Sequence, residues 1–168
     1  MTRVLVAFAT KMGSTGQIAE SIAGTLRAAG LEVDARRAGE VMDLESYDAV
    51  VLGSALYAAH WQREANRFVS RNREGLRTRP LWLFSSGPLD RRLAARNLPL
   101  TEHAAEILGD LPWRDHRTFG GRLDPAAPGV DAQILRTHQI GDFRDWAAIH
   151  DYAAAIAREI LATTRGPA

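Results

Sequence analysis

Residues 10–16 hold the densest group of side chains and glycines that could bind a ligand. The segment reads TKMGSTG and stands between a short apolar run and a pattern with helical periodicity. Backbone N–H groups of such a turn, with the hydroxyl groups of Thr10, Ser14 and Thr15, can donate to phosphate oxygens at a helix N-terminus. An ordinary turn with Ser14 or Thr15 as the helix N-cap is the alternative. The segment alone leaves both interpretations open.

Other catalytic and phosphate-binding motifs do not occur. The chain has no G-x-x-x-x-G-K-[ST], and residues 13–16 are too short for G-x-G-x-x-G, which argues against a P-loop NTPase and a dinucleotide site. A phospho-receiver domain needs acidic residues after the first strand and an aspartate after the third, and residues 9–10 and 53–54 provide neither. The absence of H-E-x-x-H and G-x-S-x-G argues against zinc and serine hydrolysis, and no metal is expected.

A second candidate segment, residues 53–61, reads GSALYAAHW and follows an apolar run. Its small residues would let a flat ring approach the backbone. Tyr57, expected in mid-loop, could stack on that ring. His60 could donate a hydrogen bond or a proton, although a histidine at a helix start is more often a cap or a surface residue. Trp61 is interpreted as the first core residue of the following helix.

A third segment, residues 85–90, reads SSGPLD and follows another apolar run. Its backbone could satisfy the polar edge of a heterocycle. A Gly-Pro turn is common in loops without a binding role, so the motif alone is weak evidence. Only the position of this segment after a strand supports a role in ligand binding. Three polar, glycine-containing loops after the first, third and fourth strands together indicate a ligand site more specifically than any one loop does.

The alternation of apolar runs and helical patterns predicts an α/β fold, a doubly wound five-stranded parallel sheet in the order 2-1-3-4-5 with helices on both faces. The expected strands are residues 4–8, 31–35, 48–53, 81–85 and 117–123. The expected helices are residues 18–29, 60–74, 101–108 and 142–162, with Thr101 as an N-cap and one or two helical turns within 132–136. In this fold, ligands bind beyond the carboxyl ends of the strands.

Length and composition predict one domain, residues 1–163, with residues 164–168 as a tail. The chain has 168 residues, 21 basic and 20 acidic, and no cysteine. The net charge of +1 gives no sign of a nucleic-acid partner, and the lack of cysteine excludes disulfides and Cys-based metal sites. No apolar run approaches the ~20 residues of a membrane span, and the start of the chain does not resemble a signal peptide. We expect a cytoplasmic protein.

The three loops resemble those of flavodoxin-like proteins, in which a hydroxyl-rich loop of the type seen in residues 10–15 binds the phosphate of flavin mononucleotide (FMN). Residues 50–69, 119–123 and 142–146 are similar to the branch that contains menaquinone-dependent protoporphyrinogen oxidase. The resemblance implies that the FMN phosphate is held by Thr10, Met12, Gly13, Ser14 and Thr15. It implies that the isoalloxazine ring is held by residues 54–60 and 85–89, among them Ser54, Ala55, Leu56, Tyr57, Ala58, Ser85, Ser86, Gly87 and Pro88.

The chain departs from that branch at three places. Ala59 stands where those relatives have glycine, Tyr57 stands where a basic residue is expected, and residues 124–141 are short and hardly basic. These differences bear on the substrate, so porphyrinogen oxidation is one candidate activity among several.

The resulting interpretation is an FMN-dependent oxidoreductase with a quinone or another small molecule as redox partner, with Tyr57 and His60 as the catalytic candidates. An electron carrier is the first alternative, although classical flavodoxins are strongly acidic and this chain has a pI of about 8.3. A flavin-free binding module is the second. The basic stretch of Arg63, Arg67, Arg71, Arg73, Arg77 and Arg79 suggests peripheral membrane contact or, as the favoured interpretation, a solvated helix face.

Overall fold

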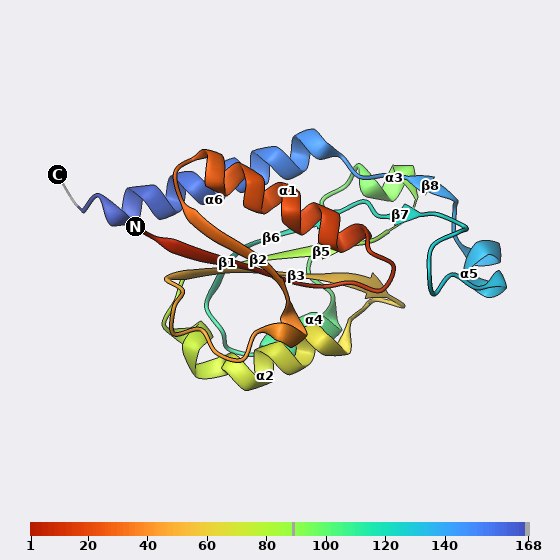
Figure 1. Ribbon diagram of the computed structural model, residues 1–168. Coiled ribbons are helices and arrows are strands. Elements are labelled where there is room, and N and C mark those ends of the chain that lie inside the picture. The colour runs from red at the N-terminus through yellow and green to blue at the C-terminus, as the bar shows by residue number, and fades with distance from the viewer. Residues whose placement is uncertain (89, 167–168) are drawn as a thin grey trace.

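The computed structural model describes residues 1–88 and 90–166, and in this part of the chain five parallel strands form the central sheet (Figure 1). The strands are β1 (Arg3–Ala9), β2 (Glu32–Arg37), β3 (Ala49–Tyr57), β5 (Leu81–Ser86) and β6 (Trp113–Phe119). Their spatial order is β2-β1-β3-β5-β6. Counted as the five long strands along the chain, this is the predicted order 2-1-3-4-5, which is confirmed.

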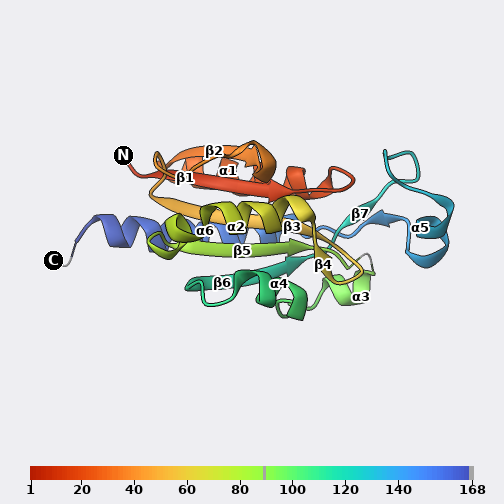
Figure 2. The same ribbon diagram turned by 90° about the horizontal axis from the view of Figure 1, so that it is seen from below.

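Helices cover both faces of the sheet, as predicted. Helices α1 (Ser14–Ala28) and α6 (Trp146–Thr164) pack on one face, and α2 (Arg63–Arg77) and α4 (Glu102–Leu108) pack on the other (Figures 1 and 2). Side chains of β1 alternate between the two layers, since Val4 and Val6 belong to the α1/α6 core and Leu5 and Ala7 to the α2/α4 core. A strand buried on both faces must be apolar throughout, which explains why the β1 sequence is such a clear signal.

The segment after the third strand is not the expected loop. Strand β3 continues to Tyr57, and a short strand β4 (His60–Trp61) pairs antiparallel with its end. Gly53 therefore lies inside the strand, where a Cβ atom would overlap the ring of Phe84. The glycine is needed for close packing and does not mark a turn. Because the hairpin uses residues 60–61, α2 begins at Arg63 and not at His60.

The expected fifth strand, residues 117–123, is displaced: β6 ends at Phe119. Strand β7 (Arg122–Leu123) leaves the central sheet and pairs with β8 (Gly141–Asp142) in a separate antiparallel hairpin. Strand β6 lies at the edge of the sheet, and its exposed residues are polar or amphipathic, so its first half has no apolar pattern. The described residues also form the short elements η1 (Ala38–Glu40), α3 (Arg91–Ala94) and α5 (Ala132–Thr137).

Helix ends follow their capping residues. Thr101 Oγ1 accepts from the backbone N–H of Ala104 at 3.3 Å, which confirms the predicted N-cap of α4. Asp145 caps α6 in the same way, and this helix begins at Trp146 because residues 141–142 belong to β8. Helix α6 reaches Thr164, and the last two residues of the expected tail, 167–168, lie outside the described residues.

The basic stretch around α2 is used largely for internal contacts. Arg71 donates to the carbonyl groups of Ala38 and Val41, and Arg73 donates to those of Ile107 and Leu108. Farther along, Arg77 pairs with Asp110 at 2.8 Å and Arg79 donates to the carbonyl of Tyr47 at 2.7 Å. These contacts tie α2 to its neighbours and favour a structural role for this stretch over membrane docking.

Candidate functional site

The loop between β1 and α1 forms a tight turn with a bare helix N-terminus. The backbone N–H of Gly13 donates to Thr10 Oγ1 at 2.9 Å, and Gly13 has a φ of +92°, in the left-handed region that favours glycine. Gly13 is the N-cap residue of α1, and no side chain caps this helix. The alternative in which Ser14 or Thr15 is a conventional N-cap is therefore wrong. The first N–H groups of an α-helix have no intrahelical partners, so this end of α1 is suited to an anion.

Thr15 carries an unused hydroxyl group at this helix end. Its side chain is 1% exposed, and Oγ1 has no hydrogen-bond partner within the protein. An unsatisfied buried polar group costs about 1–3 kcal/mol, and such groups in native structures require an explanation. Thr15 lines a small pocket of about 50 Å³ together with Thr10 and Ser14. A polar ligand in this pocket would satisfy the Thr15 hydroxyl.

All three predicted loops meet at this pocket. Besides the three hydroxyl residues, its lining includes Met12, Ala55, Leu56, Tyr57, Ser86 and Gly87 from the predicted set. Three further residues were not predicted: Lys11, Gly121 and Arg122. Lys11 and Arg122 are cations, and the described lining contains no acidic residue. The pocket is therefore lined by two cationic side chains as well as by hydroxyl groups.

The β3–β4 hairpin places Tyr57 at a strand end and not in mid-loop. Tyr57 pairs with His60, and the two-residue turn between them is Ala58-Ala59, with φ values of +50° and +63°. Turns with two positive φ values normally use Asn-Gly, and each left-handed alanine costs roughly 1–2 kcal/mol. Strained backbone of this kind is concentrated at functional sites. The hairpin thus holds a half-exposed tyrosine over the pocket at the expense of backbone strain.

Two contacts position the aromatic side chains of this hairpin. Lys11 Nζ lies 3.5 Å from the centroid of the Tyr57 ring, a close cation–π contact. The ring of exposed His60 packs edge-on against that of His103 of α4, with centroids 4.2 Å apart and an interplanar angle of 87°. Tyr57 and His60 also line a second pocket of about 390 Å³ with Thr10 and Ala58. The two catalytic candidates therefore share one surface next to the small pocket.

A third pocket, of about 500 Å³, continues from the small one through Leu56 and Gly87. Its lining includes the predicted residues Ala58 and Pro88, together with Leu93, Leu98 and His138. This volume lies within the range of ligand-binding pockets, about 300–1,000 Å³. Leu89, part of the predicted ring-binding segment, lies outside the described residues.

Two predicted residues, Ser54 and Ser85, lie behind the pockets. Ser54 Oγ accepts from the backbone N–H of Gln62 at 2.9 Å and donates to the carbonyl of Ala55. Ser85 Oγ accepts from Trp61 Nε1 at 2.9 Å and lies 3.0 Å from His116 Nε2. Both serines are buried, and neither lines any of the three pockets. Their hydroxyl groups hold the β3–β4 hairpin against the sheet. Trp61 is 2% exposed and is a core residue as expected, but it lies in β4 and not in the following helix.

Comparisons with known proteins identify the family of this chain and a related protein. Residues 5–127 match the family described as flavodoxin domain. The protoporphyrinogen IX dehydrogenase (quinone) of Escherichia coli strain K12 is 26% identical over 117 residues, which are 68% of this chain and 65% of that protein. The similarity thus spans slightly less than two thirds of that relative's length.

Solved structures share the fold across nearly the whole chain. Rubredoxin oxygen:oxidoreductase from Desulfovibrio gigas aligns with a TM-score of 0.66 at 16% identity, covering 96% of this chain and 37% of that one. Oxidised Flavodoxin 2 from Bacillus cereus aligns with a TM-score of 0.63 at 23% identity, covering 94% of this chain and 99% of that one. The family match includes all three predicted loops, and the sheet order and helix layers are those predicted for this fold. The chain belongs to the flavodoxin domain family.

Proposed function

We propose that this chain binds FMN and passes electrons or hydride between the bound flavin and a quinone or another small-molecule partner. The buried, unpartnered hydroxyl group of Thr15, next to the bare N-terminus of α1, carries the proposal. It marks a polar ligand at the loop where the family resemblance expects a phosphate. The meeting of the three loops around the same pocket supports the assignment of the rest of the ligand.

The residues divide into three groups by the part of FMN they would hold. The hydroxyl groups of Thr10, Ser14 and Thr15 would donate to the phosphate, with the turn shaped by Met12 and Gly13. The ring would lie against Ala55, Leu56, Tyr57, Ala58, Ser86, Gly87 and Pro88. Ser54 and Ser85 would act from behind, by holding the strand ends in place. When bound, flavin supplies hydride and one-electron transfer.

Tyr57 and His60 are assigned separate roles at the open side of the site. Tyr57 would shield one side of the ring, with its own orientation fixed by Lys11. His60 would hold a proton for transfer to the partner molecule, and its ring is oriented by His103. The 500 Å³ pocket next to the hairpin, lined partly by Leu56, Leu93 and Leu98, offers an apolar surface for the partner.

The choice of a quinone rests on this apolar lining and on the quinone-dependent relative from E. coli. A porphyrinogen is a second substrate candidate on the same grounds. A cytoplasmic location is part of this proposal. As a separate finding, none of the helices within residues 1–88 and 90–166 has the length and apolar character of a membrane span. An electron carrier would need an acidic docking surface, which a net charge of +1 does not favour.

The absorbance spectrum of the purified protein, before and after FMN addition and desalting, tests the proposal. We expect stoichiometric flavin absorbance that remains with the protein, and oxidation of the reduced flavin by a water-soluble quinone. A colourless protein that leaves the fluorescence of added FMN unchanged would contradict flavin binding. Retained flavin that reacts only with a protein partner would instead favour the electron carrier.

Thr15→Val is expected to stabilise the ligand-free protein and to weaken FMN binding at the same time. Valine has nearly the same shape as threonine, and the substitution removes a buried hydroxyl group without a partner. We expect a gain of about 1 kcal/mol in the free energy of unfolding and an FMN affinity about tenfold lower. Thermal melts with and without FMN measure both effects. Thr15→Ser, which keeps the hydroxyl group, is the control, and a Thr15→Val protein with unchanged FMN affinity would contradict the assignment.

His60→Ala is expected to lower quinone turnover by about 100-fold while leaving the FMN affinity within about threefold of the wild type. The effect follows from the loss of a positioned proton donor, which contributes about 10²–10⁴-fold. Stopped-flow oxidation of the reduced protein measures it. His150→Ala, in α6 and away from the three pockets, is the control. Equal rates for the His60→Ala and wild-type proteins would remove His60 from the mechanism.

A further inference from the structure

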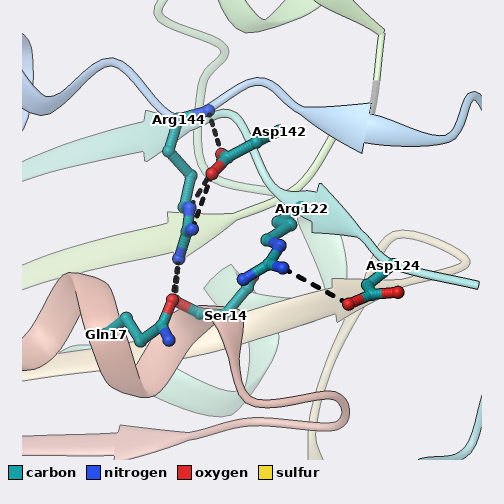
Figure 3. A network of polar contacts seen from close by, with 6 residues as sticks. All are labelled: Ser14, Gln17, Arg122, Asp124, Asp142 and Arg144. Atoms are coloured by element: carbon teal, nitrogen blue, oxygen red, sulfur yellow. Dashed lines mark hydrogen bonds and ion pairs between the residues drawn. The ribbon is translucent and has the colours of Figure 1, made fainter. Parts of the chain in front are cut away.

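The hairpin formed by β7 and β8 lies against the first turn of α1, although more than one hundred residues separate the two in sequence. Arg122 pairs with Asp142 and Leu123 with Gly141 across the hairpin, and Leu123 is 1% exposed. Figure 3 shows Arg122 of the hairpin near Ser14, and Arg144, two residues after β8, extending toward Gln17 at the start of α1. The hairpin therefore forms one wall of the small pocket, to which it contributes Arg122.

The buried side chain of Arg144 links the hairpin to this helix. The Arg144 side chain is 4% exposed and donates twice to Asp142, with Nη2 2.7 Å from Oδ2 and Nε 2.9 Å from Oδ1 (Figure 3). Its Nη1 donates to Gln17 Oε1 and to the carbonyl of Ser14. The hydrogen bonds from Arg144 hold the pKa of Asp142 below its usual range. The contacts of Arg144 with Gln17 and Ser14 therefore tie the segment that follows β8 to the first turn of α1.

Arg122 differs from Arg144 in that its guanidinium group is half-exposed and weakly held. Its ion pair with Asp124 has a distance of 3.3 Å, and both side chains are about 40% exposed. Pairs of this kind contribute about 0–1 kcal/mol, so Asp124 can be exchanged for a stronger anion. Figure 3 shows the group between Asp124 and Ser14, and Arg122 lines the pocket with the hydroxyl residues. A guanidinium group matches the geometry of phosphate with two parallel hydrogen bonds.

We propose that Arg122 leaves Asp124 and binds the phosphate group of FMN directly, so that the β7–β8 hairpin completes the phosphate site. The inference rests on the proposed function and adds a charged contact from outside the hydroxyl-rich loop. Arg144 cannot have this role, since its donors are committed to Asp142, Gln17 and Ser14. Arg144 and Asp142 are positioning residues. The consequence is selectivity for a phosphorylated flavin over riboflavin.

Fluorescence titrations with FMN and with riboflavin test this role. In the Arg122→Met variant we expect FMN affinity to fall about 10–100-fold and riboflavin affinity to change by less than about twofold. The wild-type affinity for FMN should decrease with salt, and the variant should show a weaker decrease. Arg122→Lys should recover part of the loss as a point charge. Arg158→Met, on the exposed side of α6, makes the same change in net charge and should bind both flavins as the wild type does.

A second variant keeps the test valid if Arg122→Met fails to fold. Asp124→Asn removes the competing carboxylate, and we expect FMN to bind about two- to fivefold more tightly with no change for riboflavin. Equal changes for FMN and riboflavin in these variants, or no change in either, would overturn the role of Arg122 while leaving flavin binding intact. A wild-type protein that binds neither flavin would overturn the proposed function and this inference together.

Discussion

Gly120→Ala is expected to lower the free energy of unfolding by about 3 kcal/mol and to weaken FMN binding. Gly120 lies between β6 and β7, where a Cβ atom would overlap the carbonyl oxygen of Phe143 and lie 2.8 Å from Ala94 Cβ. The first neighbour is backbone and cannot move aside without shifting the segment that carries Arg144. Forcing extra atoms into close-packed sites costs about 1–3 kcal/mol and occasionally more. Urea unfolding and FMN titration measure the two effects.

Gly24→Ala is the matched control for this substitution. Gly24 is exposed in α1, and a Cβ atom there would meet no atom within 4 Å. Alanine in place of glycine inside a helix is expected to stabilise the protein by about 0.5–1 kcal/mol. The two substitutions thus have opposite predicted signs. A Gly120→Ala protein as stable as the wild type would contradict the close approach between the β6–β7 connection and Phe143.

Lowering the pH from 7 to 4 is expected to remove about 3 kcal/mol of stability through His116 alone. Burial lowers the pKa of His116 from 6.5 to about 4. Between these values the unfolded chain binds a proton at this position and the folded protein does not, so stability increases with pH across this range. The contribution is complete above pH 6.5 and is lost as the pH falls toward 4. Each unit of pKa difference corresponds to 1.36 kcal/mol, which gives the expected total.

His116→Gln tests the origin of this pH dependence. The variant loses the contact with Ser85 and is expected to be less stable at pH 7, but to show a flatter stability profile between pH 4 and 6.5. Urea unfolding at half-unit pH steps provides the comparison. Asp34 titrates in a separate window, since a hydrogen bond from Tyr47 lowers its pKa below 3.8 and its contribution is lost only at lower pH. Parallel profiles for the wild type and the variant would show that His116 does not cause the slope.

The sheet could be predicted from the sequence wherever a strand is buried on both sides. Strands β1, β3 and β5 are continuous apolar runs because helices cover both faces of the sheet. The edge strand β6 begins four residues earlier than expected, since only its second half carries mostly buried side chains. The β3–β4 hairpin could not be recognised, because Ala58-Ala59 has none of the residues that normally mark a turn with two positive φ values.

The predicted site was incomplete for a different reason. Sequence places Ser85 and Ser86 in the same loop, but successive residues of a strand point to opposite faces. Ser86 lines the small pocket, whereas Ser85 faces Trp61 and His116. Arg122 was not expected in the pocket lining, because its position beside Ser14 depends on the path of a separate hairpin. The FGGRL sequence of residues 119–123 contributed to the family resemblance, but nothing in it indicated that Arg122 would line the pocket.

The contacts of Arg144 with the first turn of α1 join segments that are far apart in the sequence, which has a consequence for the order of events during synthesis. Arg144 Nη1 donates to the carbonyl of Ser14 across 130 residues. Helix α6 follows immediately and completes the core layer over α1. Until residues 144–164 have been translated, α1 therefore lacks both its covering helix and the contacts of Arg144. If the proposed FMN binding holds, stable binding of the phosphorylated flavin is expected only after residues 142–160 have emerged, which would make flavin loading a late event in the biogenesis of this domain.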